Sequence, residues 1–538
     1  MLRGRFSCVP VLLAGGWILI TSLAGCQPNE GGDGGPESNH NGNANTNDNA
    51  SQDTNSNDNG IVVPPGDGVC KGQICGPSGG FAVAEFPTIA EVDFGAFPEN
   101  PARPYQPREG GRFWYVATDG DDNAAGTQDA PLAAPAAALA RAATGDVILV
   151  GDGEYVIGAE EYNALTMAVP GVTLAAENIG QVRFRPPAGT DIVAVGIAAV
   201  ADDVVVDGFI IEGFRNFGVL FGRVSSPQRN CVLKHLVIDG AEDAVRAEVA
   251  DVTPNPTPIV EGLLLYDVWL RHVRVVGINC GEGPCNNVRL EALRVEMQDT
   301  GGGSGSDAVG FENGDNIVVF NVEATGAAAD GLDFKCTRVA IANAWVHDVA
   351  RNGIKLWHGG DVINALVDHT GADAAIVGKV GRFRLLNSLV AFHAVNEGEA
   401  YAATFGYDDP DTPVQLDVIN TIFYQNTGPL WASPAAYLDV RNSIFYHSPY
   451  AAIAWRELYV SDDGDSFSAL EAAGGGSDNP GMIDPAFTDP ADRDFALAAD
   501  SPARDRGTAD VEAFVDFDLR GGPRVTGGGV DLGPLEGE

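Results

Sequence analysis

Acidic side chains recur at matched positions of two neighbouring segments of this 538-residue chain. Asp307 opens the segment 307–312, and Asp330 opens the segment 330–335, which also carries Asp333. If the segments stack as neighbouring strands, the three carboxylates repel one another when all are ionised. Such a cluster retains a proton or is neutralised by a hard cation. Asp307, Asp330 and Asp333 therefore form a candidate calcium site.

A basic and aromatic segment follows, in which Lys355 and Trp357 alternate with apolar residues. Lys355 is placed one repeat beyond Asp333, where it could act as a general base if its pKa is depressed. Trp357 offers a flat surface on which a sugar ring can stack. We expect the substrate-binding residues to share this face; they are Lys335, Trp357, His358 and Lys379.

A purely structural role also fits these residues. The acidic and basic side chains, such as Asp333 and Lys355, would then form ordinary ion pairs between repeats on a solvated face. Trp357 would pack under a loop, and the aspartates would cap turns. We expect no other column of the repeat to carry such a concentration, so the two interpretations stand side by side.

Short β-rich segments that recur about every 22 residues must position these side chains. Matching segments begin at 307, 330, 352 and 374, which are 23, 22 and 22 residues apart. A single segment cannot bury its own apolar side, so the segments must stack through parallel strands. Alternation then points one apolar set inward and the charged set outward; the inward set is Val309, Leu332, Ile354 and Ile376.

An asparagine also recurs once in each repeat, at a predicted turn. Asparagine tolerates left-handed backbone geometry, and its side chain can satisfy backbone groups. We interpret the column as a structural ladder of Asn321, Asn343, Asn364, Asn387, Asn420 and Asn442. The repeat length excludes two other folds. A doubly wound α/β sheet needs crossover helices, for which these repeats leave no room, and a β-propeller needs longer repeats of about 40 residues.

This pattern resembles the right-handed parallel β-helix of the pectin lyase-like superfamily. Residues 115–127, the Ala-rich stretch 133–143 and residues 145–155 look like the N-terminal cap and first coil of that superfamily. The Ala-rich stretch has helix-forming composition and would cover the open end of the sheet. Segments between 479 and 533 match the usual closing segment. The resemblance covers roughly residues 113–538 and implies a single-stranded right-handed parallel β-helix with a helical cap.

Family 9 polysaccharide lyases share this fold and combine an Asp-bound calcium with a lysine base. Residues 330–334 and 353–356 are similar to their two motifs, with one adjacent Asp fewer and with Lys355 about one coil earlier. The resemblance implies β-elimination on a uronan. Calcium would screen a uronate carboxylate, and Lys355 would remove the proton from the neighbouring carbon.

The N-terminus is typical of an exported lipoprotein. An apolar run from 9 to 23 follows two arginines and ends in Leu-Ala-Gly-Cys26, which resembles a lipobox. We therefore expect lipidated Cys26 to anchor the protein at the cell envelope. Gln27, and not Asp, follows the cysteine, which resembles Gram-negative lipoproteins that are sorted to the outer membrane. We therefore expect the protein to lie at the outer membrane and to face the periplasm or the exterior.

Composition divides the chain into five parts. They are a signal (1–25), a disordered tether rich in Gly, Asn, Asp and Ser (26–60), an N-terminal extension (61–112), the β-helix (113–460) and its closing segment (461–538).

The net charge limits the partners. The chain has 74 acidic and 32 basic residues, a formal charge of −42. Nucleic acid and anionic lipid both need a basic face, so we expect neither, and the membrane contact is the lipid anchor alone. We expect a monomer whose partner is an extracellular polysaccharide.

Two close cysteine pairs indicate short disulfide loops in an oxidising compartment, namely Cys70 with Cys75 and Cys280 with Cys285. Cys231 and Cys336 are expected to be buried thiols.

The sequence thus predicts a surface-tethered β-helix that binds or acts on extracellular polysaccharide, with calcium-dependent uronan lyase chemistry as the enzymatic hypothesis. A non-catalytic adhesion or structural protein is the main alternative, and a hydrolase using Asp330 and Asp333 is the third.

Overall fold

The computed structural model describes residues 12–13, 16–17, 74, 91–158, 165–189, 194–222, 227–248, 258–281, 283–298, 307–371, 373–393, 401–406, 413–448, 451–461, 464–511 and 513–537. The chain divides into two units, Met1–Pro64 and Pro65–Glu538. In the first unit, β1 (Leu12–Leu13) pairs antiparallel with β2 (Gly16–Trp17). Cys26, Cys70 and Cys75 lie outside the described residues. No helix in the described ranges is long and apolar enough to cross a membrane.

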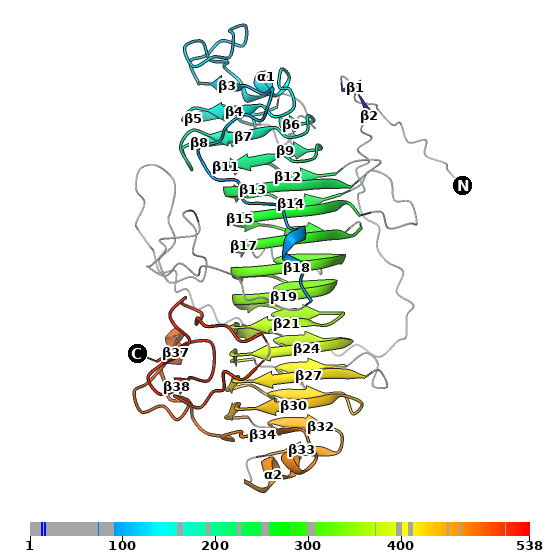
Figure 1. The fold of residues 1–538 in the computed structure, drawn as a ribbon, viewed down its shortest axis with the longest axis vertical. Helices are drawn as coiled ribbons and strands as arrows, with labels where there is room; N and C mark the ends of the chain where they lie inside the picture. Colours follow the sequence, from blue (N-terminus) through cyan, green and yellow to red (C-terminus); the bar gives the residue numbers. More distant parts are fainter. Residues whose placement is uncertain are drawn as a thin grey trace, which may run out of the picture. The chain divides into compact units, whose positions relative to one another are not determined.

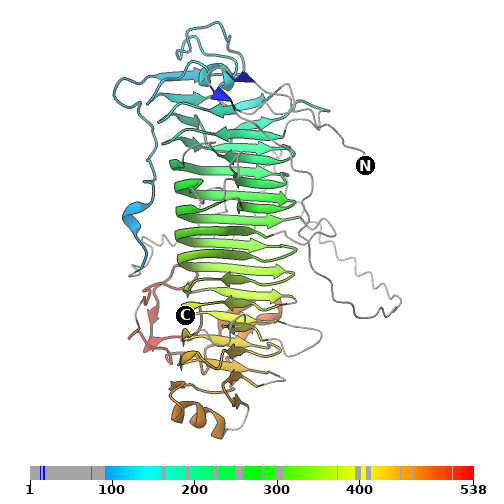
Figure 2. The same ribbon diagram turned by 90° about the vertical axis from the view of Figure 1, so that its right-hand side faces the viewer.

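The second unit is a parallel β-helix whose coils stack from β3 to β32, as Figures 1 and 2 show. Strands of successive coils pair in register on three faces, which we name A, B and C. Face A consists of β6 (Leu165–Met167), β9 (Val195–Ala199), β12 (Phe217–Phe221), β14 (Asp243–Ala247), β16 (Val276–Cys280), β20 (Ile354–Leu356), β23 (Ile376–Gly378), β26 (Ala403–Phe405), β29 (Leu430–Ala432) and β32 (Ile453–Trp455), with parts of β18 and β19.

Face B consists of β3 (Phe113–Val116), β4 (Val147–Val150), β7 (Thr173–Ala176), β10 (Val205–Asp207), β21 (Gly360–Ile363), β24 (Gly381–Leu386), β27 (Val414–Ile419), β30 (Tyr437–Arg441) and β34 (Gly476–Ser477). Face C consists of β5 (Gly153–Val156), β8 (Val182–Arg185), β11 (Phe209–Glu212), β22 (Leu366–Thr370), β25 (Leu389–Ala391), β28 (Ile422–Tyr424) and β31 (Ile444–Tyr446).

Five long strands run around the corners between faces. β13 (Gln228–Asp239), β15 (Val260–Val273) and β17 (Cys285–Met297) cover faces B and C, whereas β18 (Val309–Thr325) and β19 (Leu332–Val349) cover all three. In β19 the corners are Arg338, Asn343 and Asp348, with φ of 50°, 53° and 53°. A single left-handed residue redirects the chain without ending the pairing of the coil with its neighbours.

The asparagine column is the corner between faces B and C, and the predicted ladder is confirmed. All six asparagines have positive φ, between 48° and 56°. Their amides bond from coil to coil, since Asn343 Nδ2 donates to Asn321 Oδ1 at 3.1 Å and Asn364 Nδ2 donates to Asn343 Oδ1 at 3.1 Å. The ladder therefore pairs buried side-chain amides at a corner of left-handed backbone geometry, which asparagine tolerates better than most residues.

The interior of the coils is apolar, and the alternation was predicted correctly. Val309, Leu332, Ile354 and Ile376 are each at most 1 % exposed and belong to one continuous core. Because these four residues point inward, their neighbours Gly310, Asp333, Lys355 and Val377 form an outward column in register.

Helices lie at the two ends of the stack, visible in Figure 1. α1 (Pro135–Leu139) packs on β3, β4 and β6, so the Ala-rich stretch forms the expected cap, although only five of its residues are helical. At the other end β32 turns antiparallel into β33 (Leu458–Val460), and α2 (Gly464–Ala472) packs on β33 and β34.

Two peripheral segments bind to the outside of the coils. The segment 91–112 includes η1 (Phe94–Ala96) and runs along the outside of the coils (Figure 2). The backbone N–H of Asp93 donates to Asn316 Oδ1, and Tyr105 OH donates to Asp207 Oδ2 on face B. The closing segment carries η2 (Pro490–Asp492) and two antiparallel pairs, β35 (Phe487–Asp489) with β36 (Asp494–Leu497) and β37 (Val525–Thr526) with β38 (Gly529–Val530).

The closing segment uses the ladder as its docking surface. The side chain of Arg524 is fully buried and donates to Asn364 Oδ1, while Asn420 exchanges two hydrogen bonds with Thr508 of the closing segment. The ladder thus holds neighbouring coils together and also fixes the end of the chain to them.

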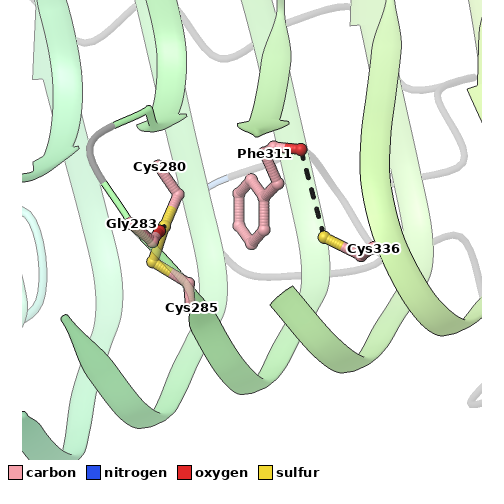
Figure 3. Close-up of a disulfide and its surroundings, with 5 residues drawn as sticks. All are labelled: Cys280, Gly283, Cys285, Phe311 and Cys336. Carbon is pink, nitrogen blue, oxygen red and sulfur yellow. Dashed lines mark hydrogen bonds between the residues drawn. A yellow bond between two sulfur atoms is a disulfide. The ribbon is translucent and has the colours of Figure 1, made fainter. Parts of the chain in front are cut away.

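The predicted disulfide between Cys280 and Cys285 is present (Figure 3). It joins the end of β16 on face A to the start of β17, and both cysteines are buried. Cys231 and Cys336 are buried thiols, as expected. Figure 3 shows Cys336 beyond Phe311, away from the disulfide.

Candidate functional site

The predicted metal, catalytic and substrate-binding residues lie on face A, on four successive coils. In the first outward column, Gly310 of β18, Asp333 of β19 and Lys355 of β20 are aligned by direct strand pairing. Trp357 and Lys335 belong to the next outward column. Neighbouring members of a column are about 4.8 Å apart.

Lys355 lies between two buried carboxylates from the coil before it. Its Nζ is 2.9 Å from Asp330 Oδ2 and 3.2 Å from Asp333 Oδ2. Asp330 is 2 % exposed and Asp333 is 6 % exposed, so both ion pairs are shielded from water. Burial opposes the charge of Lys355, but the two carboxylates outweigh burial and raise the pKa of the lysine. Lys355 is therefore held as an ammonium, the opposite of the depressed pKa that a neutral lysine base needs.

The other oxygens of the two aspartates are also engaged. Asp330 Oδ1 accepts from the Asn352 backbone N–H at 3.1 Å and from Asn352 Nδ2 at 2.7 Å. Asp333 Oδ1 accepts from Trp357 Nε1 at 3.0 Å. Burial raises the pKa of Asp333, and the charge of Lys355 opposes this shift.

Asp307 lies one coil before Asp330 and is the third carboxylate of the cluster. Its Oδ1 accepts from the Asp330 backbone N–H at 2.9 Å. Burial, together with the negative charges of Asp330 and Asp333, raises the pKa of Asp307 to about 6. Asp307 is therefore a carboxyl of this cluster whose pKa lies close to neutrality.

Trp357 stands at the centre of three lysines from three successive coils. The Nζ atoms of Lys335, Lys355 and Lys379 lie 5.1, 5.6 and 5.5 Å from the centre of its ring. Such distances are favourable for a cation against an aromatic face. Lys335 also pairs with Glu312, but the Glu312 side chain is exposed and Lys335 is only half-buried, so this ion pair is weak.

The scarcity of lysine makes this arrangement more informative. The whole chain has five lysines, at positions 71, 234, 335, 355 and 379, and three of them surround one tryptophan. The other cations of the chain are arginines. A simple count of lysines would have marked this site in the sequence.

His358 is exposed and makes no hydrogen bond or ion pair among the described residues. It follows Trp357 at the end of the strand and is not brought into the cluster of carboxylates and lysines.

The carboxylate set, as arranged, does not fit a calcium ion. A calcium ion takes six to eight oxygen ligands. Here the carboxylates of Asp330 and Asp333 already bind Lys355, Asn352 and Trp357, and the ammonium of Lys355 stands between them. In the described part of the chain, no group of three or more His, Cys, Asp or Glu side chains is set to hold a metal.

The polar strip on face A extends further than the sequence analysis suggested. Arg246, Asn279, Gly310 and Asp333 form one outward column. Asp243 is 3 % exposed, pairs with Arg246 at 3.0 Å and accepts from Asn279 Nδ2 at 3.0 Å. The signal was present, because residues 243–248 (Asp-Ala-Val-Arg-Ala-Glu) match residues 307–312 (Asp-Ala-Val-Gly-Phe-Glu).

The expectation that no other column concentrates such residues is wrong. On face C, Trp269, Arg294, Glu323 and Trp345 succeed one another in register. Trp269 is 3 % exposed and Glu323 is 4 % exposed, because arginines stack on the indole of Trp269 and neighbouring side chains enclose Glu323. Face C is thus a packed network, whereas Trp357 on face A remains partly exposed.

No protein-family model and no curated protein matches this chain. Among solved structures, the pectate lyase Pel9A is 14 % identical over 79 % of this chain and 96 % of its own, with a TM-score of 0.39. The A-module of the Azotobacter vinelandii mannuronan C-5 epimerase is 13 % identical over 69 % of this chain and 98 % of its own, with a TM-score of 0.35. XylC in complex with xylose is 10 % identical over 79 % and 98 %, with a TM-score of 0.42. The chain's own strand pairing is what identifies it as a parallel β-helix.

Proposed function

We propose that this protein binds an extracellular polysaccharide with anionic groups on face A, around Trp357. One observation carries the proposal. Three of the five lysines of a chain with a net charge of −42 surround one partly exposed tryptophan. The lipobox-like N-terminus supports a position at the cell envelope, where such polysaccharides are encountered.

Trp357 together with Lys335 and Lys379, which we name the platform, matches the chemistry of an acidic sugar. A pyranose ring stacks on an indole through its apolar C–H face. Carboxylate or sulfate groups at the rim of that ring would reach the ammonium groups of Lys335 and Lys379, which flank the indole along the column. A neutral platform would suffice for a neutral glycan, so the lysines favour an anionic one.

The enzymatic form of the proposal is β-elimination on a uronan. Lysine ammonium groups would offset the charge of the uronate carboxylate, and a group with a pKa near neutrality would accept the proton from the neighbouring carbon. A carbon–carbon double bond would form as the glycosidic carbon–oxygen bond breaks, and the leaving oxygen would take a proton from water. Asp307 has such a pKa, whereas Lys355 is held as an ammonium. Asp307 is therefore a better candidate base than the lysine that the sequence suggested.

Binding is tested by isothermal titration of polygalacturonate, alginate and neutral dextran oligosaccharides. We expect the acidic glycans to bind and dextran to bind much more weakly. Trp357→Ala and Lys379→Met should each weaken binding about tenfold or more, the equivalent of about 1.4 kcal/mol.

Arg351→Met is the matched control. It removes one positive charge from the same coils, but Arg351 pairs with Asp373 at the other end of the strand. Acidic glycans that bind Trp357→Ala and the parent protein equally would contradict the proposal. Ultraviolet detection of unsaturated products on the same panel separates a lyase from a non-catalytic adhesion protein, which would bind and release nothing.

A further inference from the structure

Three carboxylates and one ammonium form a closed charge cluster beneath the platform. The carboxylates of Asp307, Asp330 and Asp333 come from two coils, and Lys355 comes from the third. Only 15 % of the Lys355 side chain is exposed, against 3 % and 8 % of the two aspartate side chains that it contacts. Water therefore screens these charges little, and the nearest available cation must balance them.

The ammonium of Lys355 stands between the carboxylates of Asp330 and Asp333. Its Nζ contacts one oxygen of each aspartate at 2.9 and 3.2 Å. The remaining oxygens are fixed by Asn352 and Trp357, which orient both carboxylates toward the ammonium. Each of the two carboxylates therefore binds Lys355 through one oxygen and a second side chain through the other oxygen.

We propose that Lys355 is a permanent internal counter-ion that replaces a divalent cation on face A, so that the protein recognises anionic polysaccharide without calcium. The second half of this inference rests on the proposed function. Lys335 and Lys379 flank the ring of Trp357 and would contact the ligand, while Lys355 contacts Asp333, which accepts from the indole N–H of Trp357.

The first test is the thermal stability of the full mature protein in calcium chloride and in chelator. Lys355→Met should melt below the parent protein in chelator and should regain stability in calcium, because the orphaned carboxylates then take a divalent ion. Lys355→Arg keeps the charge and should behave like the parent. Lys379→Met removes a lysine that lies beside the same ring but outside the carboxylate pair, and it should gain no calcium response.

A second measurement covers the case in which Lys355→Met does not fold. Calcium is titrated calorimetrically into the parent protein and into Asp330→Asn. Any calcium binding by the parent should be unchanged in Asp330→Asn, because it occurs elsewhere on this acidic chain. Calcium binding or stabilisation of the parent that disappears in Asp330→Asn would overturn the inference, as would a folded Lys355→Met that melts like the parent and ignores calcium.

Glycan binding separates this inference from the proposed function. Polygalacturonate affinity in chelator and in calcium should agree within about twofold. Glycan binding that requires calcium would contradict the inference that Lys355 replaces a divalent cation, but it would not contradict the proposed function. No binding in either buffer, with the predicted calcium response of Lys355→Met intact, would remove the proposed function and leave the counter-ion.

Discussion

Replacing Asn343 in the ladder should destabilise the coils that carry the site. The side chain of Asn343 is fully buried; it donates to Asn321 and accepts from Asn364, each at 3.1 Å. Losing two such hydrogen bonds costs about 2 kcal/mol. The residue also has a φ of 53°, where alanine adds about 1–2 kcal/mol of backbone strain. Asn343→Ala should therefore lower the free energy of unfolding by about 3–4 kcal/mol.

Asn343→Gly separates the two contributions. Glycine avoids the backbone strain of about 1–2 kcal/mol that alanine has at positive φ. It also makes the unfolded chain more flexible, which lowers the free energy of unfolding by about 0.4–1 kcal/mol. The glycine variant should therefore be more stable than the alanine variant by roughly 0.5–1 kcal/mol, while both remain below the parent. Urea unfolding followed by tryptophan fluorescence measures these differences, and hydrogen exchange of β19 peptides shows whether the loss is local. An alanine variant that loses less than about 1 kcal/mol, or that matches glycine, would refute the reasoning.

Three further predictions concern other parts of the chain. Mass spectrometry of the membrane fraction should find an acylated N-terminus at Cys26, and soluble protein that begins elsewhere in the signal would contradict this expectation. Thiol counting on the denatured, unreduced mature protein should miss four thiols, those of Cys70, Cys75, Cys280 and Cys285; finding all of them reactive would end the pairing. Burial lowers the pKa of His393 from 6.5 to about 4, so its stability contribution is complete above pH 6.5 and is lost as the pH falls through 4. The parent should accordingly lose about 3 kcal/mol more than His393→Gln over this range, as measured by urea midpoints, and parallel pH profiles would exclude the effect.

The repeat made the fold predictable. A period of about 22 residues fixes one coil per repeat, and the alternation of apolar residues around Val309 and Leu332 fixes which side chains point outward. Register then follows, because slipping by one residue would turn every buried side chain outward. The columns on face A were therefore accessible from the sequence, including the neighbours Asp333 and Lys355.

The chemistry of the cluster was less accessible. Column position places Lys355 beside Asp333, but the reach of a four-carbon side chain to Asp330 as well depends on its rotamer and on Asn352, which turns the carboxylate of Asp330. Asp333 and Asp330 together raise the pKa of Lys355 and hold it as an ammonium, whereas the sequence suggested a base.

Contacts made by the closing segment were also beyond the repeat pattern. Arg524 reaches the ladder from 160 residues away, and no periodicity relates it to Asn364. The same reason explains why Arg493 beside Asp348 on face C could not be foreseen.

The most direct test of the central claim observes the lysines themselves. Biosynthetic incorporation of ¹³C,¹⁵N-lysine labels every lysine without modifying it, so the five lysines give a countable set of NMR signals. Titration with polygalacturonate oligosaccharides should shift the signals of Lys335, Lys355 and Lys379, assigned by single substitutions, and should leave Lys71 and Lys234 unchanged. Lys355 should also titrate at a higher pH than an ordinary lysine, because Asp330 and Asp333 hold its charge. Signals on face A that ignore the acidic glycan, while the glycan shifts other lysines or none, would contradict the account.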